Sequence, residues 1–287
     1  MRRKQTGSAN GSRTVPSGGA TGTFVLEGKE ISHRYTPDGP QVIDNVSLRV
    51  ASGEFVAFVG ASGCGKTTYL SILAGLIAPS NGTVLIDGEN ATGIPSTRRA
   101  MVFQHDRLFP WRTALQNVTF GLELRRELRS TARERSRDAL ALVGLRGNEE
   151  AYPRQLSGGM RQRVNMARAL VMEPEFLLMD EPFASLDAQT REVMQVELLR
   201  ILGSTGAGVV FITHQIEEAL YLADTVLVMG ARPGRIRKTI TVPFARPRQL
   251  ALKRTTEFQA LCEEVWLEIE DDVRAAGAVR LEEAANA

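Results

Sequence analysis

Long apolar runs, cysteines and histidines are scarce in this sequence of 287 residues. No apolar stretch reaches the ~18 to 20 residues that a membrane-spanning helix needs, and the basic N-terminus has no apolar stretch behind it, which argues against a secretory signal peptide. The two cysteines, Cys64 and Cys262, and the three histidines are not spaced like metal ligands. We therefore expect a chain that stays in a reducing cytosol, without a structural zinc site or a disulfide framework.

Acidic residues are absent from the first 22 residues, where Arg2, Arg3, Lys4 and Arg13 stand among Gly, Ser and Thr. With almost no large apolar side chains, this segment cannot offset the entropy of ordering, so residues 1–22 are predicted to be a disordered tail. In the rest of the chain, basic and acidic residues nearly balance, and the net charge of the whole is +2. We expect no nucleic-acid partner, because the body lacks the basic excess that such proteins carry.

Strand and helix patterns alternate along the chain. Short apolar segments between Phe24 and Ile86, separated by Gly, Pro, Asp and Asn, predict the strands of a mixed sheet. Leu122 to Val143, rich in Arg, Glu, Leu and Ala, predicts a helical insert. Buried-strand patterns return at Glu175 to Asp180 and Gly208 to Thr213, each flanked by helical stretches. This order is typical of an α/β fold.

The C-terminal part is predicted to be a small appendage. Two strand patterns frame the turn Ala231-Arg232-Pro233-Gly234, and apolar side chains then recur at helical spacing, at Phe258, Leu261, Cys262, Val265 and Ile269. We predict a main domain at residues 23–240, with a helical subdomain at about 105–170, and a helical appendage at residues 241–287.

The segment GASGCGKT follows the apolar strand Phe55 to Val59 and precedes the helical stretch Thr68 to Ile77, which is the context of a P-loop. Its glycines let successive N–H groups point at an anion, and the following helix adds the positive end of its dipole. Lys66 is expected to reach the β- and γ-phosphates of ATP, and the Thr67 hydroxyl to coordinate Mg²⁺. The predicted ATP-binding residues here are Gly60, Ala61, Ser62, Gly63, Cys64, Gly65, Lys66, Thr67 and Thr68.

Two plainer interpretations compete with the P-loop. One is a dinucleotide-binding loop. It is the weaker interpretation, because such loops have the order Gly-x-Gly-x-x-Gly, whereas the order here is Gly-x-x-Gly-x-Gly. A glycine-rich turn that only caps a helix is the other, and the flanking strand and helix argue against it.

Further polar side chains follow the apolar strands. Asp180 is predicted to hold Mg²⁺ and Glu181 to polarise the attacking water. His214 follows another strand and would donate a hydrogen bond to the γ-phosphate from the same sheet edge, while Gln104 could contact both the metal and the water. Taken singly, these residues also have a non-catalytic interpretation: Asp180 and Glu181 as solvated acids at a strand end, and His214 as a structural histidine.

The segment LSGGMRQR, Leu156 to Arg163, resembles the signature sequence of ABC ATPases. Ser157 and the two glycines after it open a helix with free N–H groups, a second anion-binding end in one chain, which suggests a head-to-tail dimer. The resemblance spans residues 24–240 and implies a P-loop ATPase with a mixed sheet, an antiparallel β subdomain and a helical insert. It also implies that ATP held by one subunit is covered by Ser157, Gly158, Gly159 and Met160 of the other.

The same resemblance assigns further roles. Tyr35 would stack on adenine; the alternative is core packing, which is often the role of an aromatic at a strand end. Gln104 would be the Q-loop, Asp187 the D-loop residue at the dimer seam, and His214 the switch histidine. Two positions depart from the common family pattern, Met160 in place of Gln and Gln215 in place of Asp, and neither removes a phosphate ligand or the base.

The loop HDRLFPWR, His105 to Arg112, and the downstream segment TVLVMGARPGRI are similar to the ATPase subunits of bacterial nitrate, sulfonate and taurine importers. This implies ATP hydrolysis coupled to uptake of a small anion, with a sulfonate such as taurine slightly ahead of nitrate. The implied partners are a second copy, transmembrane permease subunits and a periplasmic or lipoprotein solute-binding protein, at the cytoplasmic face of the inner membrane. An exporter's ATPase and a non-transport ABC clamp remain alternatives.

Overall fold

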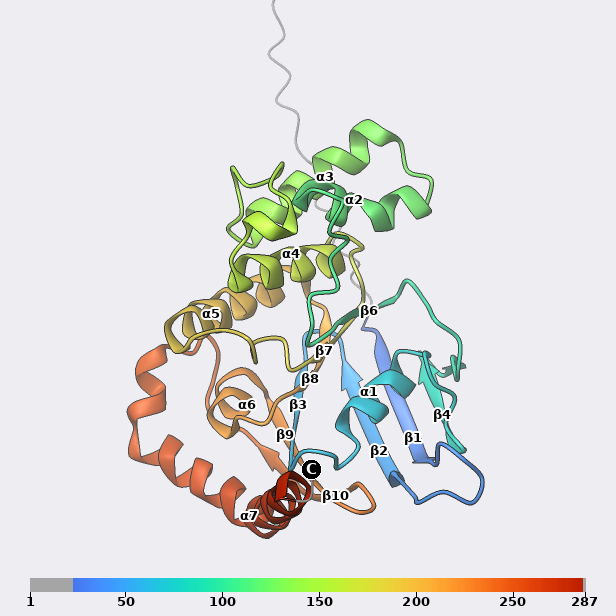
Figure 1. Cartoon of the computed structure of the whole chain (residues 1–287), viewed down its shortest axis with the longest axis vertical. Helices are drawn as coiled ribbons and strands as arrows, with labels where there is room; N and C mark the ends of the chain where they lie inside the picture. Colours follow the sequence, from blue (N-terminus) through green and yellow to red (C-terminus); the bar gives the residue numbers. More distant parts are fainter. Residues whose placement is uncertain (1–22, 286–287) are drawn as a thin grey trace, which may run out of the picture.

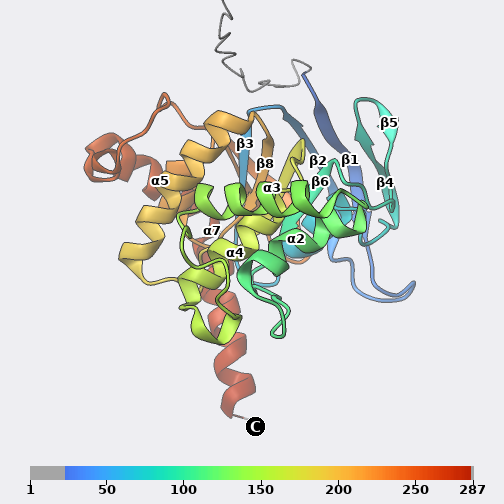
Figure 2. The same ribbon diagram turned by 90° about the horizontal axis from the view of Figure 1, so that it is seen from above.

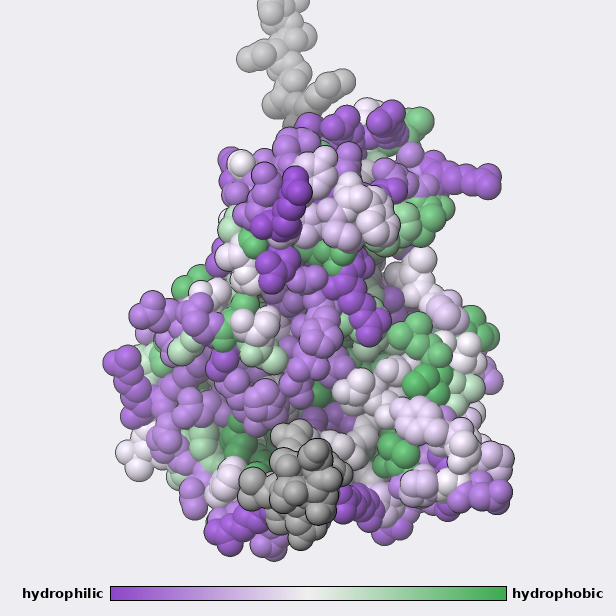
Figure 3. Space-filling model, in the orientation of Figure 1, coloured by the Kyte–Doolittle hydropathy of each residue, from purple (hydrophilic) through white to green (hydrophobic). Residues whose placement is uncertain are grey.

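The computed structural model describes residues 23–285, and the tail predicted at residues 1–22 lies outside them. Two sheets and a set of helices form the molecule, with a group of helices standing at one end (Figures 1 and 2). None of the described helices is both long and apolar enough to cross a membrane. On the face drawn in Figure 3, hydrophilic side chains predominate over this helical end, and apolar ones lie in small separate patches.

The larger sheet has six strands in the order β10-β9-β3-β8-β7-β6. Only β10 runs antiparallel to its neighbour; the other pairings are parallel. Every residue of β3, β7 and β8 is buried, as expected for apolar strands covered on both faces. The strands are β3 (Phe55–Val59), β6 (Arg99–Val102), β7 (Phe176–Asp180), β8 (Gly208–Ile212), β9 (Thr225–Gly230) and β10 (Arg235–Thr241).

The smaller sheet is antiparallel, in the order β2-β1-β4-β5. Helix α1 (Lys66–Leu73) packs between the two sheets: Tyr69 lies against Phe58 of β3 on one side and Gly28 of β1 on the other. The strands are β1 (Val25–His33), β2 (Ile43–Ala51), β4 (Asn81–Ile86) and β5 (Glu89–Asn90). The mixed sheet and the antiparallel subdomain agree with the fold predicted from the sequence.

Successive residues of β3 face two different cores. Val56 and Phe58 pack with α1 and the antiparallel sheet, whereas Phe55, Ala57 and Val59 pack with the helices on the other side. This alternation is the period of two of a strand. The helices of the second core are α2 (Ala114–Leu124), α3 (Arg129–Leu142), α4 (Gly158–Leu170), α5 (Ala188–Thr205), α6 (Ile216–Leu222) and α7 (Thr256–Ala285), with the short 3₁₀ turns η1 (Pro153–Gln155) and η2 (Leu250–Arg254).

The helical insert predicted over Leu122 to Val143 consists of the end of α2 and the whole of α3, because the chain turns back after α2, with Arg126 in the left-handed region at φ 58°. The helices α2 and α3 then face each other, and the Thr119 and Ser136 hydroxyls are 3.0 Å apart. Helix α1 ends at Leu73 rather than Ile77, since Gly75 adopts φ 76°.

Candidate active site

The glycine-rich loop between β3 and α1 has the geometry of a phosphate cradle. A Cβ on Gly60 would collide with the carbonyl oxygen of Met229, so the loop closes tightly against β9. Gly65 is the N-cap of α1 in the left-handed region, at φ 99°, and no side chain caps the helix. The N–H groups at the start of α1 are therefore available to an anion. Cys64 turns its side chain inward and is 1% exposed, so only its backbone can face a ligand.

Lys66 curls into this loop instead of extending to solvent. Its ammonium donates to the carbonyl oxygens of Gly60 and Ala61, at 2.8 and 3.0 Å, and the residue is 6% exposed. A buried ammonium held by neutral carbonyls lacks a compensating anion, which is what a bound phosphate supplies.

The Thr67 hydroxyl donates to the Asp180 carboxylate, across 3.1 Å between Oγ1 and Oδ1. Burial raises the pKa of Asp180, and the hydrogen bond from Thr67 and the charge of Lys66 oppose that rise. A hydroxyl and a carboxylate so placed are the oxygen ligands that Mg²⁺ takes, with nucleotide phosphates and waters completing its shell. The donor set fits the metal predicted from the sequence.

Three polar side chains converge at the neighbouring strand ends. His214 Nδ1 lies 3.1 Å from Glu181 Oε2, and Gln104 Nε2 donates to the same oxygen at 3.5 Å. Glu181 directly follows β7 and adopts φ 44°, a strained conformation for a residue other than glycine. Its backbone N–H is held by the Ile212 carbonyl at 2.9 Å, which fixes where the carboxylate emerges.

Tyr35 lies beside the phosphate loop. Its hydroxyl is 2.8 Å from Thr68 Oγ1, and its ring meets the buried His33 ring edge-on, with the centroids 4.9 Å apart. The side chain is nonetheless 63% exposed, so a broad aromatic face remains open at the edge of the loop. This position suits stacking on a planar base.

The residues Ser157, Gly158, Gly159 and Met160 begin α4, away from the phosphate loop (Figure 1). The Ser157 hydroxyl caps the helix by accepting from the Met160 N–H at 3.2 Å. Asp187 caps α5 in the same way, accepting from the Thr190 N–H at 3.0 Å. The structure thus brings together all of the predicted site residues except the signature set and Asp187.

Links between the Gln104 loop and α4 were not anticipated from the sequence. Arg161 donates to the Asp106 carboxylate at 2.9 Å, and Asn165 donates to the Phe103 carbonyl at 3.2 Å. Arg161 and Asn165 are four residues apart on α4, a spacing that puts them on one face. These bonds tie the strand end that carries Gln104 to the helix that Ser157 opens.

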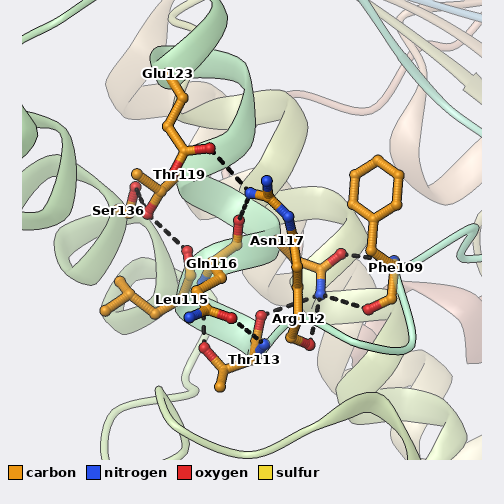
Figure 4. A network of polar contacts seen from close by, with 9 residues as sticks. All are labelled: Phe109, Arg112, Thr113, Leu115, Gln116, Asn117, Thr119, Glu123 and Ser136. Atoms are coloured by element: carbon orange, nitrogen blue, oxygen red, sulfur yellow. Dashed lines mark hydrogen bonds and ion pairs between the residues drawn. The ribbon is translucent and has the colours of Figure 1, made fainter.

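The loop Phe109-Pro110-Trp111 is held by the side chain of Asn117, which is fully buried (Figure 4). Asn117 Oδ1 accepts from the Phe109 N–H at 2.8 Å, while Nδ2 donates to the carbonyls of Phe109, Arg112 and Thr113. Arg112 in turn pairs with Glu123 at 2.9 Å. The loop is therefore fixed, yet it presents Trp111, which is 71% exposed. A rigid exposed aromatic suits contact with another protein.

Comparisons with known proteins agree with this geometry. The family model described as ABC transporter matches residues 43–184. An ABC transporter ATP-binding protein of Methanocaldococcus jannaschii is 51% identical over 208 residues, covering 72% of this chain and 78% of that protein. The taurine import ATP-binding protein TauB of Burkholderia pseudomallei is 50% identical over 204 residues, covering 71% and 78%.

Among solved structures, a dimeric ATP-binding cassette in a post-hydrolysis state bound to ADP and Pi superimposes with a TM-score of 0.68. It is 30% identical in sequence, and the match covers 77% of this chain and all of that one.

Proposed function

Because this chain belongs to the ABC transporter family as one of its ATP-binding proteins, we propose that it drives the uptake of a small anion. Its activity is the hydrolysis of ATP. Membrane transport is then the work of partner subunits to which this chain supplies energy.

ATP would bind at the loop between β3 and α1. The loop N–H groups and the start of α1 face the phosphates, and Lys66 transfers its hydrogen bonds from the carbonyls of Gly60 and Ala61 to the β- and γ-phosphate oxygens. Tyr35 stacks on adenine through its open face. Thr67, Asp180 and Gln104 would hold Mg²⁺, which neutralises phosphate charge during transfer.

Water attack on the γ-phosphate would be organised by Glu181. The Glu181 carboxylate accepts a proton from the water. Gln104 and His214 both lie at one oxygen of this carboxylate; they orient the carboxylate and contact the γ-phosphate. The single observation that carries this mechanism is the convergence of His214, Gln104 and Glu181 at the strand ends next to the Thr67–Asp180 pair.

The second anion-binding end supports a head-to-tail dimer. Within one chain, Ser157 and the glycines after it lie away from the phosphate loop (Figure 1), so they cannot cover the nucleotide bound there. In a dimer, each α4 start would close on the ATP of the other copy, adding the Ser157 hydroxyl and helix N–H groups to the γ-phosphate. Asp187 would lie at the seam.

We infer an importer of a sulfonate such as taurine, or of nitrate, from the similarity to a taurine import protein and from the exposed Phe109-Pro110-Trp111 loop. The partners would be permease subunits, which receive this loop, and a solute-binding protein that reaches the chain only through them. The chain would then sit at the cytoplasmic face of the cell membrane.

The mechanism is tested by Glu181→Gln in the full chain. This change keeps the shape of the side chain but removes the proton acceptor, so ATP hydrolysis should fall about 100-fold or more while ATP still binds. Light scattering should show an ATP-held dimer that persists in the variant. Wild-type turnover in Glu181→Gln would mean that another group is the base.

The transport role is tested by uptake in the native host. Deletion of the gene should abolish uptake of radiolabelled taurine, and the wild-type gene should restore it, whereas Trp111→Ala should restore less although its isolated ATPase rate is unchanged. If the deletion strain kept its taurine uptake but lost nitrate uptake, the transported substrate would be nitrate. Loss of efflux with no loss of either uptake would make the chain an exporter's ATPase.

A further inference from the structure

A line of buried polar side chains runs from the C-terminal segment to the helix that follows His214. Gln195 of α5 and Glu218 of α6 are 1% and 4% exposed. Gln195 Nε2 donates to Glu218 Oε1 at 3.0 Å, and Gln195 Oε1 accepts from Lys253 Nζ of η2 at 2.8 Å. One amide thus joins a carboxylate and an ammonium that come from different elements.

The Gln195 amide is oriented favourably toward the charged groups at both of its ends. The N–H end of the Gln195 amide faces the carboxylate, and its carbonyl faces the ammonium, so its dipole favours both charges. Burial raises the pKa of Glu218 and lowers that of Lys253. Lys253 also has Glu192 at 4.0 Å and the Tyr221 ring at 4.8 Å from Nζ to centroid.

Helix α6 begins directly after the predicted switch histidine. Gln215 is its N-cap, and the Gln215 N–H donates to Thr213 Oγ1 at 3.0 Å. The Gln215 side chain accepts from Arg191 at 2.8 Å, and Arg191 also donates to the Leu186 carbonyl at 2.8 Å. The contacts at Gln215 and Glu218 therefore hold the start of α6, directly after His214.

Apolar side chains of similar size would hold α6 at least as stably as these polar ones, because burying a charge carries a desolvation cost. A polar chain instead specifies one arrangement, because each hydrogen bond is satisfied only at one distance and angle. A displacement of about 1 Å in a positioned group is enough to lower a rate about 100-fold.

We propose that Lys253 is a positioning residue for His214, acting through Gln195 and Glu218, so that the C-terminal segment takes part in ATP hydrolysis. The proposal rests on the role given to His214 in the proposed function. Lys253 touches neither nucleotide nor water; it holds the helix that carries the histidine.

The test is steady-state ATP hydrolysis by the full chain carrying Lys253→Met. We expect kcat to fall about 10-fold with less than about a twofold change in KM for ATP, because binding groups are untouched. Lys253→Arg, which keeps the charge, should recover most of the rate. Glu218→Leu, which removes the acceptor of the Gln195 amide, should give a similar loss in kcat and serves as the second variant if Lys253→Met folds poorly.

Lys238→Met is the matched control. Lys238 pairs with Glu264 and Glu268 of α7, each at 3.0 Å, and so also anchors the C-terminal segment, but from β10. Its kcat should stay within about twofold of wild type, because exposed ion pairs contribute little. Equal losses of kcat in Lys238→Met and Lys253→Met would mean that any weakening of the C-terminal segment slows hydrolysis, and would overturn the proposal.

A double-variant cycle separates positioning from simple destabilisation. In a His214→Ala background, Lys253→Met should cause no further loss, because its effect passes through the histidine. A further 10-fold loss there, or a wild-type kcat in Lys253→Met while His214→Ala is impaired, would overturn this proposal alone. Wild-type activity in His214→Ala would instead contradict the role of His214 in the proposed function, and with it this inference.

Discussion

Tyr35 offers a direct test of nucleotide stacking. Tyr35→Ala should weaken ATP binding about 10-fold, because it removes a ring that covers the base, whereas Tyr35→Phe should bind nearly as well since the hydroxyl bonds only Thr68. Titration with a fluorescent ATP analogue gives the affinities. Trp266→Ala, which removes an aromatic of α7 that is 38% exposed, is the control and should be silent. Equal affinity in Tyr35→Ala and wild type would leave Tyr35 as packing against His33.

Glu218 should make the stability of the fold depend on pH. Burial is the largest cause that raises its pKa. The folded state therefore binds a proton at Glu218 more tightly than the unfolded state does, so the stability that this proton contributes is present below the unfolded pKa of about 4.3 and is lost as the pH rises through the folded value. The free energy of unfolding of wild type should thus fall, relative to Glu218→Gln, as the pH rises from about 4.

Urea unfolding of wild type and Glu218→Gln at several pH values measures that difference. A wild type that gains stability over Glu218→Gln with rising pH would reverse the sign and contradict the account of Glu218 as a buried acid.

Residues in contiguous motifs could be found from the sequence, and residues joined across elements could not. Gly60 to Thr68 are contiguous in the chain, so their spacing alone predicted a phosphate cradle; Gly60 to Gly65 form its loop, and Lys66 and Thr67 begin the helix α1 that follows. The pair Arg161–Asp106 joins residues 55 apart in the chain, and the pair Lys253–Gln195 joins residues 58 apart. No local pattern encodes such contacts, because they depend on how α4, α5 and η2 pack.

Among the elements, the start of α2 is anchored by a network of polar contacts (Figure 4). Asn117→Ala should lower the free energy of unfolding by about 1–3 kcal/mol, since the Phe109 N–H and the Arg112 carbonyl lose their hydrogen bonds to the Asn117 amide. Chemical denaturation followed by tryptophan fluorescence measures both stability and the environment of Trp111. Gln116→Ala, which removes only one side of the α2 capping box, should cost less, about 0.5–1 kcal/mol. An Asn117→Ala variant as stable as wild type would contradict the role given to this network.

Element types followed from sequence periodicity, but helix ends did not. Phe258, Val265 and Ile269 of α7 are buried, as their helical spacing predicted. The break between α2 and α3 carries no glycine or proline, so composition gave no sign of it; tertiary packing of Leu122 and Leu140 into one core sets that turn. The order of the strands in the larger sheet also depends on crossovers that local pattern does not define.

In the whole molecule, the two helix starts that we propose to bind phosphate lie in separate places. Helix α1 opens at the phosphate loop, while α4 belongs to the helical end of the molecule (Figure 1). The bonds from Asp106 and Phe103 to α4 connect the Gln104 loop with that end. In the proposed mechanism, a membrane partner that contacts Trp111 would therefore act on the same helical end that would cover the nucleotide of the second copy.

The most direct test of the head-to-tail mechanism is complementation between two inactive variants. Lys66→Ala removes the phosphate contact of one subunit, and Ser157→Arg blocks the helix start that covers the other subunit's ATP. Each variant alone should be inactive, but an equimolar mixture should recover about a quarter of the wild-type rate, because half of the dimers pair the variants and each such dimer keeps one intact site. A mixture as inactive as its components, with both variants folded and dimeric, would contradict the shared site.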